Sequence, residues 1–276
     1  MSPDILSFFS RLIEKETGII YGDNNIYQLK SRLEDICKHF KLATVEELHK
    51  EFNQLVPNSI MRQKLLDHAT NNETLFFRDP SFFTALESFI LREVLLEMPS
   101  EIRIWSAASS TGQEALSVAM ALEEMSARVP LPPFSIVATD ICDKALVKAR
   151  SGTYSDFEVM RGLSEARKNR FFQKEADGWH AKSSIHGKIK FGYNNLIRST
   201  VTGPFHIILC RNVLIYQKVE MKKVIVETLL RQLAPEGGLL LGVGETLLGV
   251  TDAIETINVS NAMFYRKSVK FNNGAA

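Results

Sequence analysis

The chain has 276 residues and carries 33 Lys+Arg against 32 Asp+Glu, a formal charge of +1. Its 45% hydrophobic and 24% charged residues are typical of a globular protein and exclude a wholly disordered, collagen-like or coiled-coil chain. Net charge by itself therefore identifies no nucleic-acid or membrane partner, and the length fits one large domain or two smaller ones.

Apolar residues recur at helical spacing through about the first ninety residues. This pattern predicts helices around residues 5–13, 26–40, 44–55 and 58–68, the third of which opens with a capping box of Thr44 and Glu47. Asp79 and Pro80 predict the N-cap and first turn of a further helix that extends to Val94.

From residue 102 onward, short apolar runs alternate with long helical segments, which predicts an α/β fold with a mainly parallel sheet. The expected strands are residues 102–106, 134–139, 205–210 and 239–243. Residues 253–259 and 262–269 flank the turn Ser260-Asn261 and predict a hairpin at the edge of the sheet. Ligands of such sheets bind at the carboxyl ends of the strands.

Residues 142–200 hold twelve Lys+Arg and six Asp+Glu, so a charge of about +6 lies in this segment. Gly178, Trp179, Gly187 and the alternation at residues 188–191 predict a small inserted hairpin. An acidic partner would explain the charge, but a solvated charged loop is the interpretation that charge alone favours.

The loop after the first expected strand, residues 106–112, consists of small residues that let a ligand approach the backbone. It matches neither GxGxxG nor GxxxxGK[ST], so a nucleoside without a pyrophosphate is the better prediction. Asp140 ends the second expected strand, where a carboxylate can accept hydrogen bonds from ribose hydroxyls. The alternative is that Asp140 is an N-cap for the helix beginning near Asp143.

Cysteine and histidine usage predicts neither disulfides nor a metal site. Cys37, Cys142 and Cys210 are widely spaced, and the histidines are scattered. The apolar runs are far shorter than the ~20 residues that cross a bilayer, and residues 1–20 do not have the pattern of a signal peptide. We therefore expect a cytoplasmic protein with no membrane insertion.

Several motifs together resemble the CheR family, the chemotaxis-receptor glutamate methyltransferases that use S-adenosylmethionine. They are TNNETLFFR at residues 70–78, WSAASSTGQE at 105–114, ATDI at 138–141, NL at 195–196 and CRNVLIY at 210–216. Their order and spacing match the family along essentially the whole chain. The resemblance implies a helical N-terminal domain (residues 1–90, linker included), a Rossmann-like methyltransferase domain (91–276) and an inserted β-subdomain at about 176–194.

The resemblance also implies a site for S-adenosylmethionine and its product S-adenosylhomocysteine. The implied cofactor-binding residues are Asn72, Thr74, Arg78, Glu114, Asp140, Asn195, Leu196, Arg211 and Asn212. Arg78 and Tyr216 would lie nearest the transferred methyl group and are the candidate catalytic residues.

Each of these residues also has an ordinary structural interpretation. Glu114 either receives the ammonium group of the cofactor or is an acid facing the helix dipole. Asn72 and Asn195 suit the amino-acid end or the adenine edge, but asparagine also forms turns. Phe76 and Phe77 either exclude water from the site or belong to the core.

The chain departs from the family pattern at three places. Residues 113–116 read QEAL where the family usually has EEPY, and Gln217 replaces a common phenylalanine. Residues 242–245 read GVGE in place of GHSE, so two polar side chains near the expected site mouth are missing. These changes affect the prediction of the substrate more than that of the fold.

The predicted activity is methylation of glutamate side chains on the helical signalling region of a chemoreceptor. Alternatives are a methyltransferase acting on another signalling protein, or an S-adenosylmethionine-binding interaction module that has lost catalysis. The resemblance suggests a receptor C-terminal peptide near His186 and Gly187, and receptor contacts through the N-terminal helices. The candidate contacts there are Lys30, Arg32, Lys38 and Lys41, although Glu34 and Asp35 among them favour a solvated face.

Overall fold

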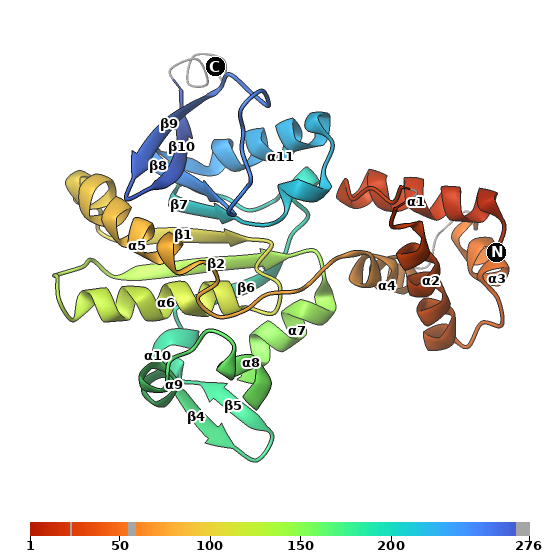
Figure 1. Cartoon of the computed structure of the whole chain (residues 1–276), viewed down its shortest axis with the longest axis horizontal. Coiled ribbons are helices and arrows are strands. Elements are labelled where there is room, and N and C mark those ends of the chain that lie inside the picture. The colour runs from red at the N-terminus through yellow and green to blue at the C-terminus, as the bar shows by residue number, and fades with distance from the viewer. Residues whose placement is uncertain (23, 55–58, 269–276) are drawn as a thin grey trace.

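A computed structural model describes residues 1–22, 24–54 and 59–268 of the chain. It consists of a helical bundle, an α/β domain and a small β-subdomain that lies beside the α/β domain (Figure 1). No helix in the described ranges is long and apolar enough to cross a membrane.

The N-terminal bundle has its own core. Its four helices are α1 (Pro3–Thr17), α2 (Ile26–Phe40), α3 (Val45–Phe52) and α4 (Ser59–Ala69). Phe9, Leu33 and Leu48, which lie on three of these helices, are fully buried together. Thr44 caps α3 as predicted, by accepting a hydrogen bond from the backbone N–H of Glu47. Leu55 and Asn58, which the sequence placed in helices, lie outside the described residues.

The α/β domain is built on a seven-stranded sheet with the order β6-β2-β1-β7-β8-β10-β9. The strands are β1 (Ile102–Ala107), β2 (Phe134–Asp140), β6 (Ile189–Tyr193), β7 (Phe205–Cys210), β8 (Leu233–Leu241), β9 (Ile254–Val259) and β10 (Ala262–Lys267). The first five strands in this order pair in parallel, whereas β10 is antiparallel to both β8 and β9. The predicted hairpin therefore forms the edge of the sheet, although Val269 lies outside the described residues.

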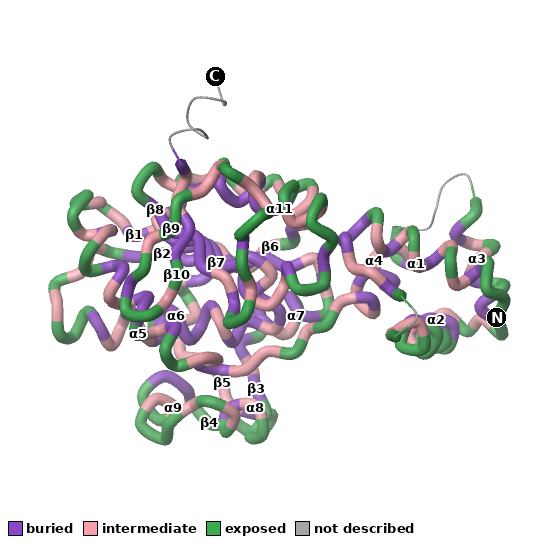
Figure 2. Tube along the Cα trace, turned by 45° about the horizontal axis from the view of Figure 1, so that its top comes forward, coloured by how far each residue is buried: buried purple, intermediate pink, exposed green. Residues whose placement is uncertain are grey.

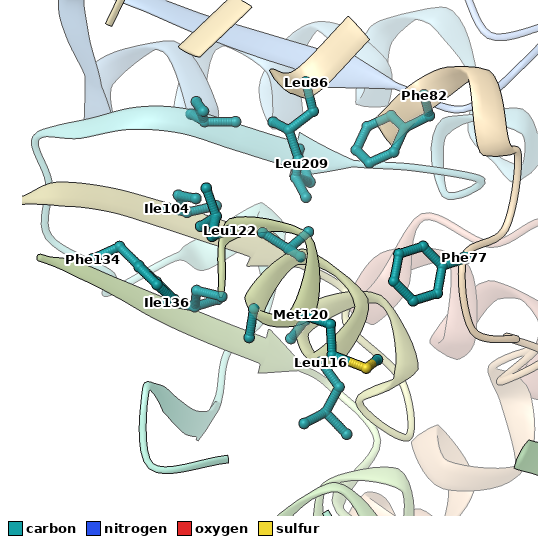
Figure 3. Close-up of a cluster of buried hydrophobic side chains, with 14 of the residues drawn as sticks. Phe77, Phe82, Leu86, Ile104, Leu116, Met120, Leu122, Phe134, Ile136 and Leu209 are labelled. Atoms are coloured by element: carbon teal, nitrogen blue, oxygen red, sulfur yellow. The ribbon is translucent and has the colours of Figure 1, made fainter. Parts of the chain in front are cut away.

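Helices cover both faces of this sheet because successive strand residues point to opposite sides. On one face, Ile207 and Leu209 pack with residues of α5 (Pro80–Phe89) and α6 (Gln113–Ser126), as Figure 3 shows around Leu209. On the other face, Ile208 and Cys210 pack with α11 (Val219–Gln232). Buried residues accordingly concentrate along the central strands in Figure 2.

The structure corrects the predicted boundary between the two domains. Helix α5 packs on the sheet, where Phe89 stacks on Phe264 of β10 at a centroid distance of 4.2 Å. Gly238 permits this contact, because a Cβ there would lie 2.6 Å from the Phe89 ring. The segment after α5 continues as the π-helical turn η1 (Ile90–Val94) and the 3₁₀ turn η2 (Leu95–Glu97). The helical bundle therefore ends at α4, and α5 belongs to the α/β domain.

The inserted subdomain also begins and ends earlier than predicted. It comprises β3 (Thr153–Tyr154), α8 (Asp156–Met160), α9 (Glu165–Phe171), β4 (Phe172–Glu175), β5 (Gly178–Ala181) and α10 (Ser183–His186). Residues 189–193 instead form β6, a strand of the main sheet in which Ile189 pairs with Ile136 of β2. The alternation at residues 188–191 correctly predicts a strand, but this strand belongs to the main sheet and not to the inserted hairpin.

Candidate active site

A cavity opens at the carboxyl ends of the parallel strands β6, β2, β1 and β7. The linker of residues 70–79 and the end of α1 also line it, and its empty space, including the part open to solvent, is about 1080 Å³. Every predicted site residue lines this cavity: Asn72, Thr74, Arg78, Glu114, Asp140, Asn195, Leu196, Arg211, Asn212 and Tyr216.

The backbone on either side of Arg78 is held in an uncommon conformation. Phe77 and Asp79 have φ angles of 48° and 60°, in the left-handed region that non-glycine residues seldom adopt. Two contacts maintain it: the Phe77 N–H donates to Ser117 Oγ at 2.9 Å, and the Arg78 carbonyl accepts from Arg211 at 2.9 Å. Uncommon conformations of this kind cluster at functional sites.

The Arg78 side chain itself is available to a ligand. Among the described residues, its guanidinium has no hydrogen-bond or ion-pair partner, although it lines the cavity and is half-buried. Tyr216, the second candidate catalytic residue, is 41% exposed, and its hydroxyl accepts a hydrogen bond of 3.3 Å from Asn71. A free cation and a phenolic hydroxyl thus border the same cavity.

Arg211 is already engaged by the protein. Its side chain is 3% exposed and pairs with Asp79 at 2.6 Å and with Glu114 at 3.1 Å. The guanidinium also lies 4.0 Å from the centre of the Phe82 ring. Asp79 therefore occupies the N-cap position of α5 without capping it through its side chain, contrary to the prediction. These contacts favour a positioning role for Arg211 rather than direct contact with a ligand.

Glu114 joins this network to β1. One of its carboxylate oxygens accepts from Arg211 and the other accepts from Ser106 Oγ at 2.7 Å. A carboxylate has about four lone-pair positions. Glu114 can therefore still accept a hydrogen bond from a ligand while it holds Arg211.

Asp140 organises the loop that follows β1. Its two oxygens accept from the backbone N–H groups of Ser110, at 2.8 Å, and Cys142, at 2.9 Å. Burial raises the pKa of Asp140, and these two hydrogen bonds oppose the shift. Helix α7 (Asp143–Ser151) has Cys142 at its N-cap position, so the alternative interpretation of Asp140 as N-cap is wrong.

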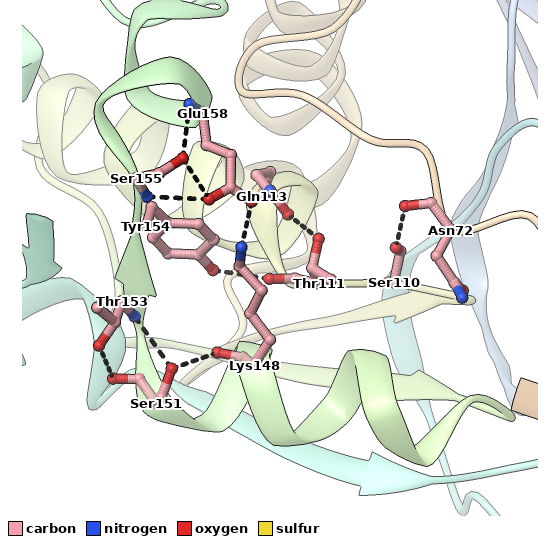
Figure 4. Close-up of polar contacts among 10 residues, drawn as sticks. All are labelled: Asn72, Ser110, Thr111, Gln113, Lys148, Ser151, Thr153, Tyr154, Ser155 and Glu158. Atoms are coloured by element: carbon pink, nitrogen blue, oxygen red, sulfur yellow. Dashed lines mark hydrogen bonds and ion pairs between the residues drawn. The ribbon is translucent and has the colours of Figure 1, made fainter. Parts of the chain in front are cut away.

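Two further hydrogen bonds hold the same loop, as Figure 4 shows. Ser110 Oγ donates to the carbonyl of Asn72 at 2.8 Å, and the buried Tyr154 hydroxyl donates to the carbonyl of Thr111 at 2.7 Å. Gly112 fits this arrangement because its φ is 92° and a Cβ would lie 3.0 Å from the Tyr154 oxygen. The linker and the inserted subdomain thus both fix the loop after β1.

The side chains of the two predicted asparagines are largely used inside the protein. Asn195 donates to the carbonyl of Glu16 at 2.7 Å and accepts from the backbone of Ile197 at 3.0 Å. Asn72 donates to Thr70 Oγ1 and to Cys142 Sγ. The turn-forming interpretation therefore accounts for Asn195, which caps η3 (Leu196–Arg198) and ties it to α1.

The sequence analysis missed several residues that shape this cavity. Glu245 accepts backbone hydrogen bonds from Asn212 at 2.6 Å and Gly242 at 2.8 Å, and so fixes the loop after β7. Asn194 lines the cavity with a buried amide group, as does Gln217, which the sequence shows only as a departure from the family pattern. Asn194 stands beside a motif residue and Glu245 ends the altered GVGE segment, but neither position signals a role by itself.

The departures from the family pattern lie mostly outside the cavity. Val243 is 72% exposed, and Gly244 has open space where a side chain would stand. Ala115 and Leu116 are fully buried in the core on the α6 face. Phe76 and Phe77 belong to the same core, so the core interpretation of these two residues applies. Gln217 is the departure that does line the cavity.

Unpartnered polar atoms concentrate in this cavity. Within the described residues, five buried side-chain atoms lack a hydrogen-bond partner, and four of them belong to residues that line it: Ser109 Oγ, Asn194 Nδ2, Arg211 Nε and Gln217 Oε1. Buried polar groups without partners are rare in proteins, so their concentration around one cavity sets this region apart from the ordinary core. The donor, acceptor and apolar groups present fit a nucleoside with an amino-acid tail, as in S-adenosylmethionine.

Sequence comparison finds relatives along nearly the whole chain. A chemotaxis protein methyltransferase of Vibrio parahaemolyticus is 40% identical over 262 residues, which cover 94% of each chain. A chemotaxis protein methyltransferase of Pseudomonas putida is 35% identical over 275 residues, covering 96% of this chain and 99% of that one.

A family model described as the CheR methyltransferase, SAM binding domain, matches residues 72–263. This match begins in the linker and includes α5, in agreement with the boundary that the packing gives. Among solved structures, the magnesium protoporphyrin IX methyltransferase from Synechocystis PCC 6803 with bound SAM is 11% identical, with a TM-score of 0.39, over 85% of this chain and 94% of that chain.

Proposed function

The chain belongs to the CheR family of S-adenosylmethionine-dependent chemotaxis methyltransferases, and we propose that its substrates are glutamate side chains of a chemoreceptor. The observation that carries this proposal is the Arg78 guanidinium, which borders the cavity without a partner among the described residues. A guanidinium suits a carboxylate because it can donate two parallel hydrogen bonds to it.

The residues that would bind the cofactor line the same cavity. Asp140 and the loop after β1 would hold the ribose, and Glu114 would accept a hydrogen bond from the ammonium group of the amino-acid tail. Thr74, Leu196 and Asn212 would complete the contacts. When bound, S-adenosylmethionine supplies a methyl group on a positively charged sulfur, which makes its carbon electrophilic.

A glutamate substrate needs no general base in this reaction, because its pKa of ~4.3 leaves it ionised near neutral pH. One carboxylate oxygen forms the new bond to the methyl carbon while the sulfur–carbon bond breaks, giving a methyl ester and S-adenosylhomocysteine. The roles of Arg78 and Tyr216 are to bind the carboxylate and orient that oxygen toward the methyl group. Positioning of this kind supplies much of the rate in such transfers.

If Arg78 bound the substrate carboxylate too strongly, it would stabilise the bound substrate more than the transition state, in which the opposite charges of the carboxylate and the sulfonium are being neutralised. Arg78 is only half-buried, which moderates its attraction for a carboxylate. We therefore assign orientation rather than charge neutralisation to Arg78.

Receptor contacts are expected outside the cavity as well. Of the four basic candidates in the N-terminal bundle, Arg32 donates to the carbonyl of Ala69 at 2.8 Å, and Lys38 pairs with Asp35 at 2.9 Å. Lys30 and Lys41 are exposed and form no ion pair among the described residues, so they remain the candidates for an acidic receptor surface.

A receptor C-terminal peptide would meet the inserted subdomain at β4 rather than at the turn around His186. The His186 ring faces the carbonyl of Ala149 at 3.1 Å, whereas within the described ranges β4 pairs only with β5 and leaves one edge open. An extended peptide can add to such an edge through backbone hydrogen bonds. Removing the C-terminal peptide from a receptor would then weaken its binding to this chain.

The direct test is transfer of labelled methyl from S-adenosylmethionine to receptor cytoplasmic fragments. We expect a labelled product that base treatment releases, because a carboxylate ester hydrolyses readily. A base-stable product would contradict glutamate as the acceptor. Transfer only to a different signalling protein would keep the methyltransferase and overturn the receptor as its substrate.

A further inference from the structure

A second cavity lies next to the first, where β8 ends and β10 begins. Residues 240–245 and 261–263 line it together with the start of α5, and its empty space, including the part open to solvent, is about 700 Å³. Because β8 is parallel to its neighbour β7, this cavity lies at the same edge of the sheet as the first. Arg211 lines both cavities, so its side chain forms part of the wall between them.

Glu245 fixes the loops of the two cavities to each other. Its carboxylate accepts from the backbone N–H of Asn212 at 2.6 Å, which lines the first cavity, and from that of Gly242 at 2.8 Å, which lines the second. Gly242 permits the close approach, because a Cβ there would lie 2.8 Å from Asn212 Nδ2. The second cavity therefore has a fixed position relative to the first.

The free surface of the second cavity is mainly apolar. Its two charged groups are already engaged, since Arg211 pairs with two carboxylates and Glu245 accepts from backbone N–H groups. Val243 and Met263, which also line the cavity, are 72% and 41% exposed. Covering such side chains with another apolar group removes apolar surface from water, which is favourable. The second cavity therefore suits an aliphatic side chain better than a charged one.

The distance between the cavities matches the spacing of side chains on a helix. Arg78 lines the first cavity and Ser81, three residues later, lines the second, so the chain between them spans at most about 11 Å. On one face of an α-helix, residues three or four apart lie about 5–6 Å from each other, and residues seven apart lie about 10.5 Å apart. A helix whose glutamate meets Arg78 can thus place a second side chain in the second cavity.

We propose that the second cavity binds an apolar side chain of the receptor helix, one or two turns away from the glutamate that is methylated. This inference rests on the proposed function, because it takes a helical receptor segment as the substrate. It makes Val243 and Met263 specificity-determining residues that select among glutamates. Gly244 leaves the cavity accessible, because a Cβ there would meet open space. Val243 and Gly244 depart from the family pattern, so the preference would be a property of this chain.

The test uses a receptor cytoplasmic fragment in which one acceptor glutamate is kept and the others are replaced by glutamine. The positions three, four and seven residues away on either side are all glutamine in the reference fragment, and each is changed to leucine in turn. We expect leucine at one of these positions to raise kcat/KM for methyl transfer about tenfold, because its side chain becomes buried. Equal kcat/KM for all the fragments would overturn the proposal.

Variants of the protein then assign the preference to the second cavity. Val243→Thr and Met263→Gln nearly keep the shape of each side chain and make it polar, so together they should reduce the tenfold preference to about twofold. Leu248→Gln is the matched control, because Leu248 is 75% exposed in the same loop as Val243 and lines neither cavity. It should keep the tenfold preference. A double variant that binds S-adenosylhomocysteine normally and keeps the tenfold preference would overturn the proposal.

Calorimetry separates this inference from the proposed function. With S-adenosylhomocysteine present, the preferred leucine fragment should bind about tenfold more tightly than the reference fragment. Binding with this preference but without methyl transfer would contradict the proposed activity and support the role of the second cavity. Methyl transfer without the preference would support the activity and contradict the role of the cavity, and a lack of both binding and transfer would contradict both.

Discussion

Arg211 donates a hydrogen bond of 2.9 Å to the carbonyl oxygen of Arg78, 133 residues away in the sequence. One arginine thus fixes the backbone of another while its own side chain is neutralised by Asp79 and Glu114. The consequence is that Arg78 can present an unpaired guanidinium to the cavity from a rigid segment.

Arg78→Ala should lower kcat by about 100-fold, because a carboxylate that is no longer oriented spends little time in the reactive geometry. The affinity for S-adenosylhomocysteine, measured by calorimetry, should change little. Arg161→Ala is the control, since Arg161 forms a partly exposed pair with Glu73 near the same segment. Loss of kcat and of S-adenosylhomocysteine affinity in equal measure would make Arg78 mainly a cofactor ligand.

Arg211→Met should lower the free energy of unfolding by about 3–5 kcal/mol, because Asp79 and Glu114 would lose their buried cation. Denaturant titration measures this change. Adding Glu114→Gln to Arg211→Met should recover part of the loss by removing one uncompensated charge. Arg128→Met, which breaks an exposed pair with Glu87, should cost about 0–1 kcal/mol. A similar cost for both arginines would contradict the buried network.

Asp140→Ala should weaken S-adenosylhomocysteine binding by about 10- to 100-fold, because the Ser110 and Cys142 N–H groups lose their buried acceptor. The loop after β1 then loses the contact that sets its shape. Asp143→Ala is the control, because the Asp143 side chain does not line the cavity, and calorimetry measures the affinity of both variants. Unchanged affinity in Asp140→Ala would remove Asp140 from the ligand site.

Acidification should destabilise the protein in part through His206. Burial lowers the pKa of His206 below its usual value of 6.5, and its Nδ1 accepts from the Arg103 N–H at 3.0 Å, so the folded state keeps the ring neutral. The unfolded state therefore binds the proton more readily, and stability falls as the pH drops below about 6.5. His206→Gln should show a smaller loss between pH 7.5 and 5.5, whereas the exposed His39→Gln should behave like the unmodified protein.

Local patterns in the sequence predicted most of the sheet, because strand and helix periods depend on residues that are close in the chain. The strands 102–107, 134–140 and 205–210 agree with prediction to within one residue, whereas β8 begins six residues earlier than expected and ends at Leu241. The two domain-level errors, α5 and β6, have a common cause. Amphipathic spacing shows that a segment packs, but not which core it packs against.

The motifs also placed every predicted site residue at one cavity, since parallel strands bring their carboxyl ends to the same edge. What each residue does there was decided by partners far away in the chain. Gln217 meets Thr17 across 200 positions, and Asn195 meets Glu16 across 179.

The sequence by itself therefore determined the family, the sheet and the cofactor class, because these follow from local periods and short motifs. Only the tertiary structure decided which polar atoms are already satisfied, as in the two carboxylate oxygens of Asp140, and which remain free for a ligand, as in the Arg78 guanidinium. The physical reason is that a hydrogen-bonding group is satisfied by whatever lies within about 3 Å of it, and in this cavity those neighbours come from distant parts of the chain.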